Sequence, residues 1–379
     1  MSTEFLLKGL PADNPLGFMA ALGVVVTACD AFPIPAEQDA VRLGWSRAMG
    51  GWRPTLHVPG SLTEEGLVAM LHGRLHRKFD PAASKAADER RGERNRCAKE
   101  LKKGLVHLKE LGRKTPSEVR AKLVKEEIEP ARRAVDAAGA AYRRALAQGG
   151  APDLAVSLGA SLKQVSGEAF GEAVRPWALG ASSADRRLAD LAAGFGSDGV
   201  VDQDGNLEPT QFSKHNGAGG RNMLADVARL MTGVVPDRIT AALFWPWTYS
   251  DEKLGLGWDP ADARSHALMA ENPEKAGSFT MHGANLLAFE GLRLMPAVPS
   301  GRRLTTTGTS RVGGVRAFSW PIWSAPLGVE AIRTLVALGE AQEVIPNRTR
   351  LARLGVEEVY RSEHFTFGKY PRFRPARAV

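Results

Sequence analysis

The segment from Pro15 to Cys29 constrains the fold most, because it has helical spacing and carries no charged side chain on any face. Asp13 or Asn14 can cap such a helix, and proline suits its first position. A helix that is apolar all round is normally buried on every side. Each of its glycines costs about 1 kcal/mol of helix stability relative to alanine, which is tolerable where the glycine lets another backbone approach closely. We therefore expect a buried helix at the centre of the protein.

Strand patterns flank this helix in the sequence. Residues 1–10 are typical of a short strand, and residues 41–58 alternate apolar and polar side chains around a pair of glycines, which predicts a β-hairpin. Residues 302–320 hold a second, basic pair of strands around a glycine-bearing loop. Together with several helical patterns, these segments predict an α+β fold whose globular body mixes short β-hairpins and buried helices.

The composition changes between residues 85 and 133, where sixteen Lys or Arg accompany nine Asp or Glu, so about +7 of the net charge of +8 falls there. Two apolar stripes at helical spacing are interrupted near Pro116, which suits the first turn of a second helix. The pattern predicts a long, charged α-helical hairpin inserted into the body. A charged helix most often has a solvent-exposed face, and the excess of one sign raises contact with a phosphate backbone as the alternative.

Four parts make up the predicted domain organisation. An N-terminal α+β part covers residues 1–78, and the charged helical hairpin follows at 79–148. The main α+β body, which holds a glycine-rich loop and the basic hairpin, covers residues 149–345. Residues 346–379 form the last part, a basic and aromatic C-terminal tail, and we expect its residues 365–377 to be exposed.

The net charge of +8 and the pI near 9.6 are typical of proteins that bind nucleic acid, although a GC-rich genome also enriches alanine and arginine. Cys29 lies in the apolar helix and Cys97 in the charged hairpin, so no disulfide is indicated and a reduced, cytoplasmic protein is expected. The apolar segment 15–29 is too short to span a bilayer comfortably, and no membrane partner is expected.

Three segments are candidates for contact with DNA. The glycine-rich loop 213–222 precedes a helical pattern and would present free backbone N–H groups to phosphate, although it lacks the Walker signature and a flexible connection is the alternative. The hairpin tip at 305–316 and the C-terminal tail offer arginines and hydroxyl groups that suit a nucleic-acid groove. The candidate DNA-binding residues are Lys214, Asn216, Gly217, Gly219, Gly220, Arg221, Arg302, Arg303, Thr307, Ser310, Arg311, Arg316, Lys369, Arg372 and Arg374, with Asn216, Arg221, Ser310 and Arg311 as the expected readers of base edges.

Aromatic side chains are dense between residues 243 and 258. Such side chains can stack on nucleic-acid bases. They more often belong to a hydrophobic core, and the core is the favoured interpretation here.

No catalytic set of residues stands out, and neither a cofactor nor a metal is expected. His72 and His76 lie four residues apart and could share a metal, but the zincin glutamate is missing and no later ligand is indicated. The nucleophile elbow, the Cys-x-x-Cys motif and the dinucleotide-binding fingerprint are also missing from the sequence. Because carboxylates can assemble in space, a metal-dependent nuclease remains a less favoured alternative.

Four stretches, taken in their order along the chain, resemble a known family. They are residues 10–24, 256–260, 285–296 and 318–327. This set is similar to the large subunits of type I CRISPR effector complexes (Cascade), in particular subtype I-G, formerly I-U. The resemblance covers both ends of the globular body and leaves out residues 80–148.

The resemblance implies a non-catalytic subunit of a guide-RNA-directed surveillance complex. Such a subunit would recognise the short motif that flanks the target (the PAM) in double-stranded DNA, help to open the duplex, and recruit a separate helicase–nuclease. Its partners would be the guide-RNA-bound backbone subunits of Cascade. A stand-alone DNA- or RNA-binding protein is the alternative.

Overall fold

The computed structural model describes residues 2–32, 40–78, 81–111, 115–148, 154, 158, 165–180, 182–203, 205–208, 210–213, 223–261, 279–367 and 370–379. Two compact units make up the chain: Met1–His76 with Ser161–Val379, and Arg77–Ala160. Helices and several small antiparallel sheets occur together, so the predicted α+β class is confirmed. None of the helices in the described part of the chain combines the length and the apolar character needed to cross a bilayer.

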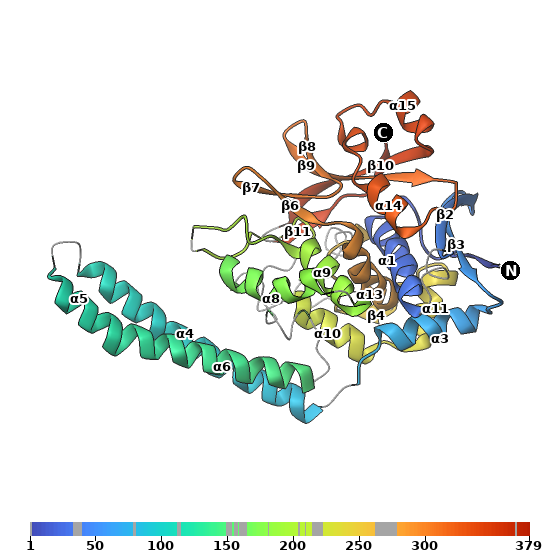
Figure 1. Ribbon diagram of the computed structural model, residues 1–379. Coiled ribbons are helices and arrows are strands. Elements are labelled where there is room, and N and C mark those ends of the chain that lie inside the picture. Colours follow the sequence, from blue (N-terminus) through green and yellow to red (C-terminus); the bar gives the residue numbers. More distant parts are fainter. Residues whose placement is uncertain are drawn as a thin grey trace, which may run out of the picture. The chain divides into compact units, whose positions relative to one another are not determined.

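Helix α1 (Pro15–Ala31) lies at the centre of the first unit, and its first fourteen residues are buried. The side chain of Asn14 caps it by accepting a hydrogen bond from the backbone N–H of Leu16 at 2.8 Å. Helix α13 (His282–Gly291), buried over its whole length, packs along α1 (Figure 1). A methyl group at Gly23 of α1 would overlap the carbonyl oxygen of Leu287 in α13. The glycines of α1 therefore serve the close backbone approach that the sequence predicted.

Further helices surround this pair. Helix α11 (Pro236–Phe244) and helix α10 (Met223–Gly233) pack on α13, and α3 (Glu64–Leu75) packs on α1. Helices α8 (Gly167–Leu179) and α9 (Ser183–Phe195) pack on each other, and α9 also contacts the short 3-10 helix η4 (Leu292–Leu294) that continues α13.

An antiparallel sheet in the order β1-β3-β2 is formed by β1 (Ser2–Leu6), β2 (Arg42–Ala48) and β3 (Gly51–Pro59). The β2–β3 hairpin turns at Met49 and Gly50, whose φ angles are 51° and 77°. Positive φ at both central residues is typical of the tight hairpin turn that matches strand twist. The predicted hairpin is confirmed, with its turn one residue earlier than the glycine pair.

Residues 346–379 do not form the exposed tail that the sequence predicted. After helix α15 (Arg348–Arg353), strand β10 (Val356–Phe367) pairs with β9 (Val315–Trp323), β11 (Tyr370–Phe373) and β12 (Arg377–Ala378). Phe373 is fully buried and packs against Phe318 of β9. The alternation of aromatic and basic residues is the period-two pattern of a strand with one buried face, so the prediction of an exposed tail was wrong.

The basic segment 302–320 also folds differently from the prediction. It contributes to two hairpins, one between β6 (Ala297–Ser300) and β7 (Arg303–Thr306) and one between β8 (Thr309–Val312) and β9. The predicted loop between the strands is thus largely strand β8. Glycines with positive φ at positions 301, 308, 313 and 314 reverse the chain several times where one reversal was expected.

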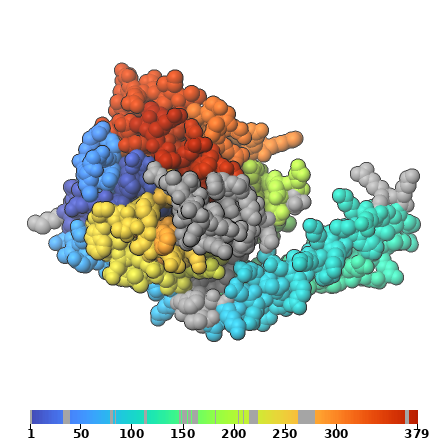
Figure 2. Space-filling view, turned by 180° about the vertical axis from the view of Figure 1, so that it is seen from behind, coloured from blue at the N-terminus to red at the C-terminus, as the bar shows by residue number. Residues whose placement is uncertain are grey.

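Aromatic side chains join α1 to the three-stranded and the five-stranded sheet of the first unit. The ring of Phe18 in α1 stacks on Trp45 of β2 at 6.0 Å and on Trp320 of β9 at 5.7 Å between centroids. The indole N–H of Trp323 donates to the carbonyl of Leu43 at 2.8 Å. From behind, the C-terminal strands (red) and the N-terminal strands (blue) accordingly lie on one continuous surface (Figure 2).

The second unit is a helical hairpin. Helix α4 (Pro81–Glu110) packs against α6 (Glu129–Gln148). Two shorter elements precede α6 in the chain: helix α5 (Ser117–Leu123) and a π-helical turn, η1 (Val124–Ile128). Small and apolar residues fill the contact between the helices, among them Ala87, Leu123, Ile128, Ala138 and Tyr142. The charged residues lie mostly on the solvent-exposed sides of these helices.

Candidate nucleic-acid interface

A pocket of about 380 Å³ in the first unit lies where three segments meet. The first leads into the glycine-rich loop, the second is the β8–β9 hairpin, and the third is the β10–β11 pair. We name this pocket the arginine groove. Its lining residues are Glu208, Thr210, Gln211, Ser213, Arg311, Arg316, His364, Phe365, Thr366 and Pro371.

Two arginines of the β8–β9 hairpin supply the positive charge of the arginine groove. The Nη1 group of Arg316 donates to Gln211 Oε1 at 3.0 Å, and the Nη1 group of Arg311 donates to the carbonyl of Gly314 at 3.3 Å. Both side chains are exposed, and neither makes an ion pair with any described residue. Each arginine now donates to a neutral acceptor, which is a weak hydrogen bond. It can give up this bond in order to donate to a phosphate oxygen or to the edge of a base.

Buried hydrogen bonds hold the segment that leads into the glycine-rich loop. The hydroxyl groups of Thr210 and Thr306 lie 3.2 Å apart, and the backbone N–H of Gln211 donates to Thr306 Oγ1 at 3.1 Å. The indole N–H of Trp258 donates to the carbonyl of Phe212 at 2.8 Å. These bonds fix the backbone that carries Gln211 at the edge of the groove.

The predicted hairpin residues outside the groove have different surroundings. Thr307 Oγ1 donates to the carbonyl of Pro296 at 2.8 Å, and Ser310 Oγ donates to the carbonyl of Gln342 at 3.1 Å. These hydroxyls stabilise the fold itself, and Ser310 lies in strand β8 where the sequence predicted a loop tip. Arg302 and Arg303 lie exposed at the β6–β7 turn and do not line the groove.

The predicted C-terminal arginines lie beside the β10–β11 pair. The Nη1 group of Arg372 donates to the carbonyl of Pro371 at 3.3 Å. Arg374 lies over the ring of Phe365, 5.1 Å from its centroid, and 3.8 Å from Glu363. The carboxylate of Glu363 thus partly compensates the charge of Arg374. Seven predicted residues lie outside the described part of the chain: Lys214, Asn216, Gly217, Gly219, Gly220, Arg221 and Lys369.

The sequence did not single out Gln211 or Thr366 as members of a site. Their neighbourhood depends on the pairing of β9 with β10, which joins residues about forty positions apart. The sequence holds one signal that could have found them, the alternation of aromatic and basic side chains in residues 364–373. Interpreted as a strand pattern, this alternation predicts that the segment pairs with another strand such as β9.

Charge is distributed unequally between the two units. Residues 77–160 hold 20 Lys or Arg and 12 Asp or Glu, a balance of +8 that equals the net charge of the whole chain. The remaining residues share the other 30 Lys or Arg and 30 Asp or Glu. Lys99, Lys102 and Lys109 of α4 are exposed and make no ion pair with any described residue, whereas Lys103 pairs with Glu100 at 2.8 Å. The helical hairpin is therefore the electropositive part of the molecule.

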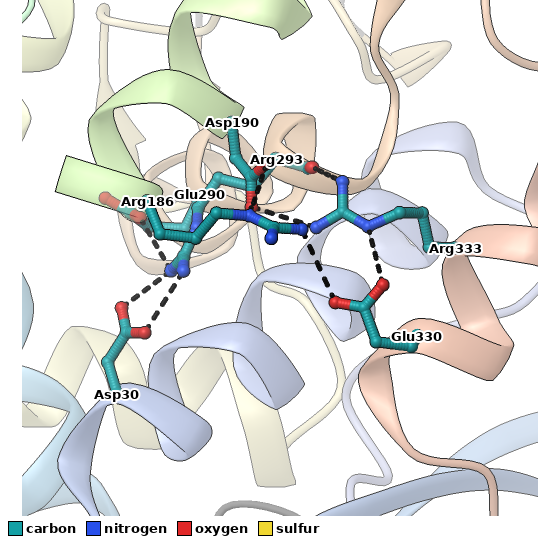
Figure 3. A network of polar contacts seen from close by, with 7 residues as sticks. All are labelled: Asp30, Arg186, Asp190, Glu290, Arg293, Glu330 and Arg333. Carbon is teal, nitrogen blue, oxygen red and sulfur yellow. Dashed lines mark hydrogen bonds and ion pairs between the residues drawn. The ribbon is translucent and has the colours of Figure 1, made fainter. Parts of the chain in front are cut away.

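A second charged cluster in the first unit is balanced and joins four α-helices and the 3-10 helix η4 (Figure 3). Glu290 of α13 pairs with Arg187 of α9 at 2.5 Å, and Arg293 of η4 makes two hydrogen bonds to Asp30 of α1, at 2.6 and 3.1 Å. Arg333 of α14 (Val329–Val336) pairs with Asp190 of α9 at 2.9 Å.

Each of these arginines is matched by a carboxylate, although the cluster borders a pocket of about 590 Å³. Arg186 at the pocket pairs with both Asp190 and Glu330. A balanced network leaves no excess charge for an anionic ligand, and we assign it to the packing of these helices.

Metal and acid–base sites are not indicated in the ranges that the structure describes. No group of three or more His, Cys, Asp or Glu side chains there could hold a metal ion. The rings of His72 and His76 stack at 4.9 Å, and Nε2 of His72 lies 3.2 Å from the carbonyl oxygen of Val234. One ring nitrogen of His72 thus already has a hydrogen-bond partner in the backbone.

Comparison with known proteins returns no relative. No protein-family model matches the chain, and neither a curated protein nor a solved structure does. What the chain binds must therefore be inferred from the charges and side chains described above.

Proposed function

We propose that this chain is the non-catalytic large subunit of a guide-RNA-directed DNA surveillance complex, and that its arginine groove contacts the PAM in duplex DNA. The observation that carries the proposal is the meeting of three segments at one groove. The sequence favoured the glycine-rich loop, the basic hairpin and the C-terminal segment separately, and the described parts of all three line the same pocket.

The groove offers side chains suited to reading base edges. Arginine donates two parallel hydrogen bonds to guanine, and glutamine pairs with adenine through one donor and one acceptor. Arg311, Arg316 and Gln211 supply these groups. The bond between Arg316 and Gln211 would be exchanged for bonds to a base pair, so that both side chains keep a hydrogen-bond partner in either state.

The helical hairpin supports binding that does not depend on sequence. Its surplus of eight positive charges would neutralise phosphates and release counterions, which makes binding steeply salt-dependent. The guide-RNA-bound subunits and the helicase–nuclease belong to the proposal through the family resemblance, and so does a location in the cytoplasm.

Duplex binding tests the proposal. The purified chain is titrated with PAM-bearing and PAM-less duplexes, alone and with a guide-RNA complex of the proposed type, across a series of salt concentrations. We expect PAM preference to appear or sharpen with the complex. The Arg311→Ala/Arg316→Ala variant should lose this preference, with each lost base contact worth about 1–3 kcal/mol, while Arg302→Ala/Arg303→Ala, two exposed arginines outside the groove, should keep it.

A stand-alone nucleic-acid-binding protein is the second candidate, because the charge of the helical hairpin would suffice for non-specific binding. This alternative predicts equal, salt-dependent binding to any duplex, indifferent to the guide-RNA complex. That result, with no effect of the Arg311 and Arg316 substitutions, would overturn the large-subunit proposal. Divalent-metal-dependent cleavage of the DNA would instead favour a nuclease.

A further inference from the structure

The aromatic segment after α11 divides into a buried and an exposed part. Phe244 and Trp258 at its two ends are buried, as the sequence favoured. Trp245, in contrast, is 55% exposed, and Pro246 beside it is exposed as well. Trp247 and Tyr249 are partly exposed. Single exposed apolar residues are ordinary, whereas three aromatic residues at alternate positions of one partly exposed segment form a patch.

Hydrogen bonds hold this segment in place. The indole N–H of Trp247 donates to the carbonyl of Ala242 in α11 at 3.0 Å. Asp251 accepts the backbone N–H of His282 at 2.7 Å and lies 3.0 Å from Nε of Arg238. The aromatic segment is thus tied to both α11 and α13.

The imidazole of His282 supports the backbone just beyond the aromatic residues. Its Nε2 lies 3.2 Å from the carbonyl oxygen of Glu252 and 3.1 Å from that of Lys253. Because both neighbours are acceptors, Nε2 carries the proton, and Nδ1 accepts from Arg238 at 3.1 Å.

The backbone of this segment is strained. Tyr249, Lys253 and Leu254 have φ angles of 51°, 59° and 56°, a region that side-chain-bearing residues rarely adopt. Strain of this kind persists only where the surrounding contacts enforce it, and it is concentrated at functional sites. The surrounding contacts therefore enforce the course of the backbone at Tyr249 and just beyond it against a local preference.

Two basic residues, Lys8 and Arg53, lie near the backbone of Trp245. A side chain at Gly9 would come within 2.8 Å of the carbonyl oxygen of Trp245, so the chain at Lys8 and Gly9 lies against the aromatic segment. Lys8 is exposed and makes no ion pair with a described residue, and its carbonyl accepts a 3.0 Å hydrogen bond from Nε of Arg53. On the segment itself, exposed Lys253 follows exposed Glu252.

We infer that the Trp245–Tyr249 segment is a stacking site for single-stranded nucleic acid, separate from the arginine groove. Unpaired bases expose their flat faces, and they stack on aromatic side chains while nearby cations contact the phosphates. A duplex hides those faces, so double-stranded DNA would not use this site. An apolar peptide would need the rings but would gain nothing from Lys8 and Arg53.

Fluorescence anisotropy with labelled oligothymidylate, oligouridylate and a duplex tests this inference on the full chain. We expect Trp245→Ala to raise the Kd for one or both single strands about tenfold or more, in line with the loss of one stacked base. Trp245→Phe should retain most of the affinity, because the aromatic face remains. Duplex binding should not change. The DNA and RNA strands show which sugar the site accepts.

Two further variants keep the outcome interpretable. Ile345→Ala removes an exposed apolar side chain elsewhere in the first unit, 84% exposed, and should leave single-strand binding unchanged. Arg311→Ala/Arg316→Ala should weaken duplex binding while sparing single-strand binding, so the two sites can fail separately. Unchanged single-strand affinity in Trp245→Ala, or an equal loss in Ile345→Ala, would overturn the stacking site. Thermal unfolding of each variant confirms that it is folded.

Discussion

Gly23 of α1 lies directly against the backbone carbonyl of Leu287 in α13, at a separation that leaves no room for a side chain. The contact is reciprocal, because a methyl group at Gly291 of α13 would overlap the carbonyl oxygen of Met19 in α1. The two most buried helices of the first unit therefore meet backbone to backbone. Such contact maximises the number of atoms in van der Waals range along the crossing.

Gly23→Ala should destabilise the protein strongly. The added methyl would overlap a backbone oxygen that cannot rotate away, so the helices would have to separate, at a cost of about 3 kcal/mol or more. Gly73→Ala is the matched control, because Gly73 lies in helix α3 with open space around it. It should gain up to about 1 kcal/mol through helix propensity. Urea unfolding measures both, and similar stabilities for the two variants would refute the close crossing.

Many elements of the fold are predictable from the sequence. The helix at 15–29, its cap, the hairpin at 41–58 and the inserted helical hairpin all follow from local periodicity and turn residues, which act over a few positions. The partner of Gly23 does not follow, because α13 is more than 250 residues away in sequence and only tertiary packing selects it.

The site is less predictable than the fold. Arg311 and Arg316 were identified as candidates because arginine beside glycine turns suits nucleic acid, and that reasoning is local. Their neighbours Gln211 and Thr366 join them only through strand pairing across the C-terminal sheet. Ser310 was misplaced at a loop tip because the sequence did not reveal that Gly308 reverses the chain before strand β8.

Glu290→Gln should also destabilise the protein, through charge. The Glu290 side chain is 2% exposed and lies 2.5 Å from Arg187 and 3.7 Å from Arg293. The neutral amide would leave Arg187 and Arg293 with Asp30 as their shared carboxylate, so the cost should lie at or below the about 3–5 kcal/mol of breaking a fully buried pair.

A matched control for Glu290 lies in the same network. Glu330→Gln removes a carboxylate that is 74% exposed and should cost less than about 1 kcal/mol, because water screens it. The midpoints of chemical unfolding compare the two variants. Equal shifts would mean that burial does not set the strength of the network.

Tyr360 should make stability fall at alkaline pH. Burial, and to a smaller extent Asp13 and Glu358, raise the pKa of its phenol above the usual value of about 10. The unfolded chain would then lose the phenolic proton before the folded chain does, so the contribution of Tyr360 is present below about pH 10 and is lost as the pH rises through the folded pKa. Tyr360→Phe removes the titrating group, and its unfolding free energy should decline less over that range than that of the wild type. A parallel decline would contradict the raised pKa.

Neutralising three lysines of the helical hairpin should weaken nucleic-acid binding uniformly across sequences. Lys99, Lys102 and Lys109 lie at helical spacing on α4, are exposed and have no described ion-pair partner. If each contacts one phosphate, their replacement by glutamine should lower the slope of log K against log salt by about 0.9 per lysine on duplex DNA. Replacement by arginine keeps the charge and should preserve the slope. PAM preference should survive both sets of changes, because phosphate contacts carry no sequence information; an unchanged slope in the glutamine variant would show that this side of the hairpin does not contact DNA.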